Sequence, residues 1–182
     1  MIKKILVTLA VFLYSNISNA ANLECENNLS MFKNILREEL NILNYGDIHQ
    51  LTKYDKKYSY SAQFSKKHDN YVYINGKWLK PAEYEARMTD VMKFIRSGNY
   101  NIVGFNLLPI KANRLISIGE ICVIPIETKI RMGEKAELET NDWIFVRNLE
   151  KNKWYVFTYL ESVNQKDFKE FFPDFPIDIQ LK

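Results

Sequence analysis

Residues 141–157 read NDWIFVRNLEKNKWYVF, and this stretch decides the fold. Two runs rich in aromatic and β-branched residues, 143–146 and 154–157, flank a polar segment with a turn at 150–152. Such runs favour strands, and the short turn favours antiparallel pairing. Both runs are apolar at consecutive positions, which is more than one buried face requires. The pattern predicts a curved sheet that is covered on one side and encloses something on the other.

Upstream of this stretch the chain keeps an alternating pattern back to Asn101. It predicts strands at 101–108, 113–118, 120–132, 136–148 and 153–160, with turns at Gly119 and Gly133. On strand 120–132 one face carries Cys122, Ile124, Ile126, Thr128, Ile130 and Met132. The other face carries Val123, Pro125, Glu127, Lys129 and Arg131. The outer half of this strand is therefore expected to face solvent.

The N-terminal half has helical spacing instead. Apolar residues recur on one face from residue 29 to 43, after a possible cap at Asn28 or Ser30, and Gly46 ends this helix. Asp47 is expected to cap a short second helix, and the polar segment 55–70 to be a loop with a short strand near 58–64. Asn75-Gly76 predicts a hairpin between 71–74 and 77–80. Pro81 opens a helix over 82–95, and a short last helix ends at Pro173.

This order of elements resembles the NTF2-like superfamily, also called cystatin-like or SnoaL-like. Tyr45-Gly46-Asp47-Ile48 resembles the step between the first two helices of such domains, and 141–147 with 153–157 resembles their paired final strands. The resemblance covers most of residues 29–172. It implies an α+β fold: a cone in which two to three N-terminal helices pack in a strongly bent antiparallel sheet, with a short C-terminal helix. The family holds enzymes, binding modules and dimerising scaffolds, so this fold does not select a function.

The first twenty residues have the pattern of an export signal. Lys3 and Lys4 precede an apolar run, and Ser18-Asn19-Ala20 offers small residues where a signal peptidase cleaves. We expect cleavage after Ala20, a single domain over 21–182, and a periplasmic or secreted protein. The apolar run is too short to cross a bilayer, so no membrane anchor is predicted. Without its two lysines the chain has 23 basic and 22 acidic residues, which gives no electrostatic case for nucleic acid.

The two cysteines, Cys25 and Cys122, are 97 residues apart. In an oxidising compartment a lone pair is more often a disulfide than two free thiols. The alternative is that Cys122 is a small buried apolar residue and Cys25 is unpaired. A bond would tie the N-terminal segment to the sheet.

Residues with obvious chemistry are few. The two histidines, His49 and His68, have no spacing to each other or to a cysteine that predicts a metal site, and no cofactor-binding motif is present. The candidates for acid–base catalysis are Asp47, His49 and Asp142. Each also has a structural interpretation: Asp47 as a helix cap, His49 as a surface histidine, and Asp142 as a residue near the start of a strand.

The aromatic residues of the last strands are the candidates for binding: Trp143, Phe145, Tyr155, Phe157 and Tyr159. They could wall an apolar pocket, fill a core, or form a sheet face for a homodimer. The leading expectation is an exported non-catalytic module that binds a small apolar ligand or a protein partner. The alternatives are a periplasmic immunity or inhibitor-type protein, and a small hydrolase or isomerase with an Asp or His inside the cone.

Overall fold

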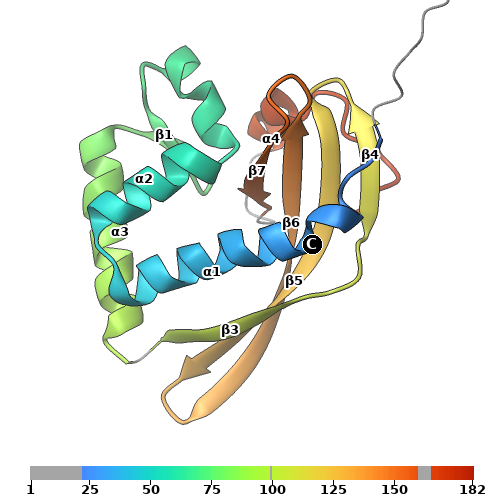
Figure 1. Cartoon of the computed structure of the whole chain (residues 1–182). Helices are drawn as coiled ribbons and strands as arrows, with labels where there is room; N and C mark the ends of the chain where they lie inside the picture. Colours follow the sequence, from blue (N-terminus) through green and yellow to red (C-terminus); the bar gives the residue numbers. More distant parts are fainter. Residues whose placement is uncertain (1–21, 99, 160–164) are drawn as a thin grey trace, which may run out of the picture.

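The computed structural model describes residues 22–98, 100–159 and 165–182, so the expected signal peptide lies outside the described residues (Figure 1). The helices are η1 (Glu26–Asn28), α1 (Leu29–Tyr45), α2 (Ile48–Tyr58), η2 (Ser61–His68), α3 (Pro81–Arg96) and α4 (Gln165–Phe171). The strands are β1 (Val72–Ile74), β2 (Lys77–Leu79), β3 (Asn101–Leu107), β4 (Ala112–Ile116), β5 (Gly119–Met132), β6 (Lys135–Asn148) and β7 (Lys153–Thr158). No helix within these ranges is long and apolar enough to cross a membrane.

The main sheet is antiparallel and strongly curled, in the order β3-β5-β6-β7, and β4 pairs with the same edge of β5 as β3. The edge strand is irregular in two places. It has a bulge between Ile102 and Gly104, and it breaks between β3 and β4 beside Pro125. Proline has no N–H to donate, so it is tolerated at a position where the neighbouring strand ends and its pairing is interrupted. Bulges increase the twist of a strand. These features explain how the α+β architecture predicted from the sequence obtains its bent sheet.

Each face of the sheet has its own core. Phe145 lies opposite Val156, and Val146 lies opposite Tyr155, so alternate residues of β6 and β7 point to opposite sides. On the first face, α1 packs through Phe32, Ile35 and Leu36 onto Cys122, Ile124, Ile126 and Phe145. On the second face, α4 and the C-terminal segment pack through Phe171, Phe172 and Phe175 onto Ile121, Val123, Ile144 and Val146. The apolar residues on both faces of the last two strands are therefore buried, one set under α1 and the other under α4 and the C-terminal segment.

The solvated outer half predicted for strand 120–132 is only partly correct. Lys129 and Arg131 are exposed, but Val123 is 0% exposed. The reason is the C-terminal segment, which packs over this face. At Lys182 its backbone N–H donates a hydrogen bond to the Asp142 carboxylate, and its carbonyl accepts one from the Asp142 N–H. The sequence pattern of one strand does not show what a distant segment will cover.

The N-terminal predictions are largely confirmed. Asn75 and Gly76 have φ of 47° and 76°, the positive pair that a two-residue hairpin turn requires, and Pro81 is the first residue of α3. The short strand expected near 58–64 is wrong, because η2 occupies that segment and only Ser59 bridges to Val156. The ring centroids of Tyr60 and Phe64 lie only 5.4 Å apart. In a strand, four residues at about 3.3 Å each would separate the two residues by a longer distance.

The N-terminal segment is fastened to the sheet next to Cys122. Cys25 and Cys122 lie at disulfide distance, with their Cα atoms 5.7 Å apart. The Glu120 carboxylate accepts hydrogen bonds from the backbone N–H groups of Glu24 and Cys25, at 2.7 and 3.0 Å. Arg147 pairs with this carboxylate at 2.8 Å and donates to the carbonyl of Asn22 at 2.6 Å. The predicted tie between the N-terminal segment and the sheet is therefore present, with a buried ion pair that the sequence did not suggest.

Candidate functional site: a cavity among the helices

The structure separates the three residues considered for catalysis. Asp47 caps α2, and its carboxylate accepts from the backbone N–H of Gln50 at 2.8 Å. His49 is exposed on the same helix. Asp142 is 2% exposed, but it pairs with Lys111 at 2.6 Å and accepts from the backbone of Lys182 at 2.8 Å. Asp47 and Asp142 are thus held in structural contacts, and the three residues do not share one site.

The five candidate aromatics are also divided. Trp143 and Phe145 lie on the α1 face, where Phe145 stacks on Phe32 with ring centroids 4.0 Å apart. Tyr155 and Phe157 lie on the α4 face. Tyr159 joins them there, because its ring contacts Phe168 at 5.5 Å. The register of β6 and β7 causes this division, so the five rings form no common wall.

A cavity of about 430 Å³ lies where α1, α2 and α3 meet the sheet. Trp143 lines it from β6, and Val156, Phe157 and Thr158 line it from β7. The helices supply apolar and aromatic groups, among them Leu43, Leu51, Tyr54, Tyr84, Met88, Val91, Phe94 and Ile95. Figure 1 shows α2 and α3 grouped at one end of α1. A smaller apolar hollow of about 90 Å³ shares Glu39, Leu43, Ile102 and Trp143 with it.

Two carboxyl groups line the cavity, and each accepts a hydrogen bond from a buried tyrosine. The Tyr54 hydroxyl donates to Glu39 at 3.3 Å, and the Tyr84 hydroxyl donates a short hydrogen bond to Asp55. Glu39 comes from α1, Asp55 from α2 and Tyr84 from α3, so the cluster joins all three helices. Tyr54 and Tyr84 are each 3% exposed, and both carboxyl residues are half-buried because they border the cavity.

Burial controls the protonation of these groups. Loss of hydration, together with the smaller effect of the nearby Asp55, raises the pKa of Glu39 from 4.5 to about 7, while the hydrogen bond from Tyr54 acts in the opposite direction. Loss of hydration likewise raises the pKa of Asp55 from 3.8 to about 6, against the hydrogen bond from Tyr84. The same burial raises the pKa values of both tyrosines, which stay neutral donors. The cavity therefore holds two carboxyl groups that ionise near neutral pH.

Within the part of the chain that the structure describes, no lysine, arginine or histidine lines the cavity, so neither carboxyl group has a cationic partner among these residues. Across the described ranges, His, Cys, Asp and Glu form no group of three that could hold a metal ion. Perturbed carboxyl groups in an apolar cavity are typical of binding and catalytic sites. The inter-helix cavity is accordingly the candidate functional site.

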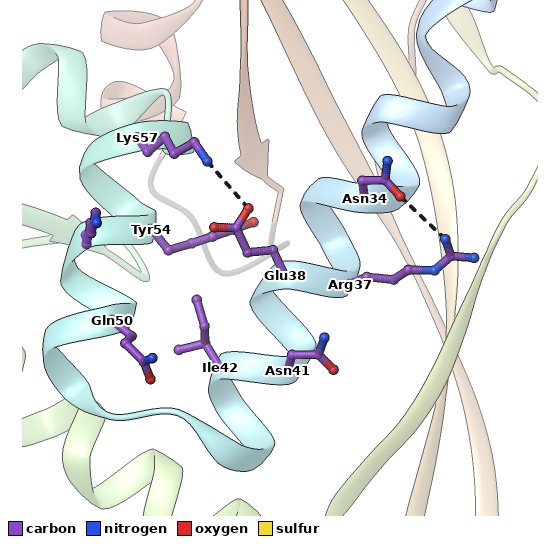
Figure 2. A pocket seen from close by; sticks show the side chains of 9 residues that line it. Asn34, Arg37, Glu38, Asn41, Ile42, Gln50, Tyr54 and Lys57 are labelled. Carbon is purple, nitrogen blue, oxygen red and sulfur yellow. Dashed lines mark hydrogen bonds and ion pairs between the residues drawn. The ribbon is translucent and has the colours of Figure 1, made fainter.

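A second hollow, the α1–α2 groove, is also lined by Tyr54 and is larger, about 580 Å³ (Figure 2). It is lined by amides and charged residues such as Arg37, Glu38 and Lys57. Figure 2 shows Glu38 reaching toward Lys57, a pair 3.6 Å apart whose side chains are 43% and 51% exposed. The Glu38 and Lys57 side chains are hydrated and neutralise each other in part. The carboxyl groups in the cavity, in contrast, have no partner of opposite charge among the described residues of its wall.

Sequence reasoning missed Glu39, Asp55 and Tyr84 as site residues, although a signal for two of them exists. Glu39 follows Leu36 by three residues, and Asp55 follows Leu51 by four, so both carboxyl groups fall on apolar helix faces. An acidic residue on a buried face is costly unless it has a partner or a function. Tyr84 gives no such signal, because a tyrosine on an apolar face is ordinary core.

Comparison of the chain with protein-family models, with curated proteins and with solved structures found no match.

Proposed function

We propose that this protein is a binding module that holds a small, mostly apolar ligand in the inter-helix cavity. The observation that carries this proposal is the cavity itself: about 430 Å³ of space with aromatic and aliphatic walls and two polar clusters. Cavities of roughly 300 to 1,000 Å³ with these walls are the usual sites for small organic ligands.

The rim of the cavity supports the same proposal. Val91 and Phe94, on α3, line the cavity and are 37% and 56% exposed. Large apolar side chains grouped at an opening lose contact with water when a ligand covers them. A ligand that fills the cavity and reaches its rim would therefore bury surface that the free protein leaves exposed.

We further propose that the domain is an exported member of the NTF2-like superfamily. The curled antiparallel sheet and the helix α1 packed across it support the fold assignment. The cysteine pair at disulfide distance supports an oxidising compartment, as does the pattern of the first twenty residues. Residues 21–182 would then act in the periplasm or outside the cell.

The binding proposal can be tested with N-phenyl-1-naphthylamine, an uncharged probe whose fluorescence rises in an apolar site. The protein should bind it saturably, and Ala62→Trp, which fills the cavity from η2, should abolish the signal. Ala86→Trp adds the same side chain to an exposed position of α3 outside the cavity lining and serves as the matched control. Equal fluorescence with both variants, or no binding by the native protein, would reject the proposal.

A second function, acid–base catalysis, is favoured by the ionisation of Glu39. A carboxyl group with a pKa of about 7 can both donate and accept a proton near neutral pH, and the Tyr84–Asp55 pair adds a hydrogen-bond donor. Hydrolysis of aryl esters or isomerisation of enones can be assayed directly. Turnover that disappears in Glu39→Gln and has an apparent pKa near 7 would replace the non-catalytic proposal.

A further inference from the structure

We propose that the ligand of the inter-helix cavity is an organic cation, namely a protonated amine with an apolar body, an inference that rests on the proposed function. Among the described residues that form the cavity wall, Glu39 and Asp55 carry the charged groups, and none has a side chain of opposite charge. A bound ammonium would supply the missing partner for both.

The geometry gives an ammonium suitable contacts. The carboxyl groups enter from two helices, and their remaining lone pairs are available, since each receives one side-chain hydrogen bond, from Tyr54 or Tyr84. The cavity wall also contains the rings of Tyr73, Tyr100 and Trp143. Aromatic faces attract cations when water is excluded, so the wall suits both the charged end and the apolar body of an amine.

A metal ion fits this site less well. Within the described residues no three His, Cys, Asp or Glu side chains gather, and hard cations require six or more oxygen ligands, with protein carboxylates among them. The cavity wall is largely apolar, which favours a ligand with hydrocarbon groups over a hydrated ion.

Amine binding must depend on pH, because the charges of the Glu39 and Asp55 carboxyl groups depend on pH. The titratable groups facing the ammonium are Glu39 on α1, Tyr54 and Asp55 on α2, Tyr73 on β1, Tyr84 on α3, and Tyr100. The tyrosines stay neutral, so the carboxyl groups control the charge of the cavity. Both are mainly ionised at pH 8 and mainly protonated at pH 5. Affinity for an amine should therefore rise with pH, and binding near pH 6.5 should release protons.

The test compares two probes of equal size, 4-phenylbutylamine and 4-phenylbutanol, by isothermal titration calorimetry. An aliphatic amine, like lysine, stays protonated below a pH of about 9, so only the protein titrates between pH 5 and 8. At pH 8 the amine should bind at least about tenfold more tightly than the alcohol, equivalent to about 1.4 kcal/mol. At pH 5 this preference should disappear.

Variants locate the effect. Glu39→Gln combined with Asp55→Asn should bind both probes alike, while Glu38→Gln, which alters a carboxylate of the α1–α2 groove, should keep the preference. If the alcohol binds as tightly as the amine at pH 8, the cation inference fails and the binding function stands. If a preference for the amine survives the double substitution, the assigned site is wrong. If neither probe binds, the inference fails together with the proposed function.

Discussion

Substituting Glu39 by glutamine should stabilise the protein strongly at pH 8 and only slightly at pH 5. Between these values the native Glu39 carboxyl must ionise in a poorly hydrated cavity beside Asp55, which raises its pKa from 4.5 to about 7. At about 1.4 kcal/mol for each pH unit, ionisation in the folded state costs about 3 kcal/mol relative to the unfolded chain. Glutamine has the shape of the protonated acid and can still accept the hydrogen bond from Tyr54.

The sign follows from proton linkage. A carboxyl group whose folded pKa exceeds its unfolded value binds more protons in the folded state, so native stability falls as pH rises from about 4.5 through about 7. Glu39→Gln removes this loss. The gain in the free energy of unfolding should approach about 3 kcal/mol at pH 8, as an upper limit because the residue is half-buried, and should be no more than about 1 kcal/mol at pH 5.

The assay is urea unfolding, followed by tryptophan fluorescence at pH 5, 6, 7 and 8. Glu38→Gln is the control, because Glu38 is 43% exposed and its ion pair with Lys57 is hydrated, so its effect should be small at every pH. Equal changes in the free energy of unfolding at pH 5 and pH 8, or a loss of stability at pH 8, would mean that ionisation of the Glu39 carboxyl does not destabilise the folded protein. A site that keeps such a group despite its cost is expected to use it.

Three further predictions concern the sheet and its attachments. Reducing the Cys25–Cys122 pair, or replacing either residue by serine, should lower the free energy of unfolding by about 4 to 5 kcal/mol, since the bond closes a long loop; two reactive thiols in the native protein would contradict this. Arg147→Met should cost about 3 to 5 kcal/mol in urea unfolding, because it leaves the fully buried Glu120 carboxylate without its charged partner, whereas Arg114→Met, at an exposed position of β4, should cost little. Trp143→Ala should weaken binding of the naphthylamine probe, while Tyr155→Ala, on the α4 face, should lower stability and leave the dissociation constant unchanged; the reverse pattern would show that the binding surface was assigned to the wrong face.

Much of the architecture could be predicted because it depends on local signals. The Asn75-Gly76 hairpin, the start of α3 at Pro81 and the Asp47 cap depend on the conformational preferences of one or two residues. The two apolar faces of β6 and β7 follow from the period of the strands. What local signals could not show was the partner of each face: α1 covers one, and α4 with the C-terminal segment covers the other.

The candidate site was predictable only in part, for a geometric reason. Trp143 and Tyr155 both looked like pocket residues, but the register of β6 and β7 decides which face each one occupies, and register is not visible in two separate runs. The same limit applies to Glu39, Asp55 and Tyr84, which three different helices bring together. Their chemistry arises from helix packing, which no spacing along the sequence encodes.

The central claim, that the inter-helix cavity binds a small ligand, is tested most directly by the indole N–H signals in an amide-correlation NMR spectrum. The chain has three tryptophans, and Trp143 is the one that lines the cavity, while Trp78 packs on the α4 face and Trp154 in the α1-face core. Titration with 4-phenylbutylamine at pH 8 should shift the Trp143 signal saturably and leave the other two nearly unchanged. An unmoved Trp143 signal, or a larger shift at Trp78 or Trp154, would contradict the claim.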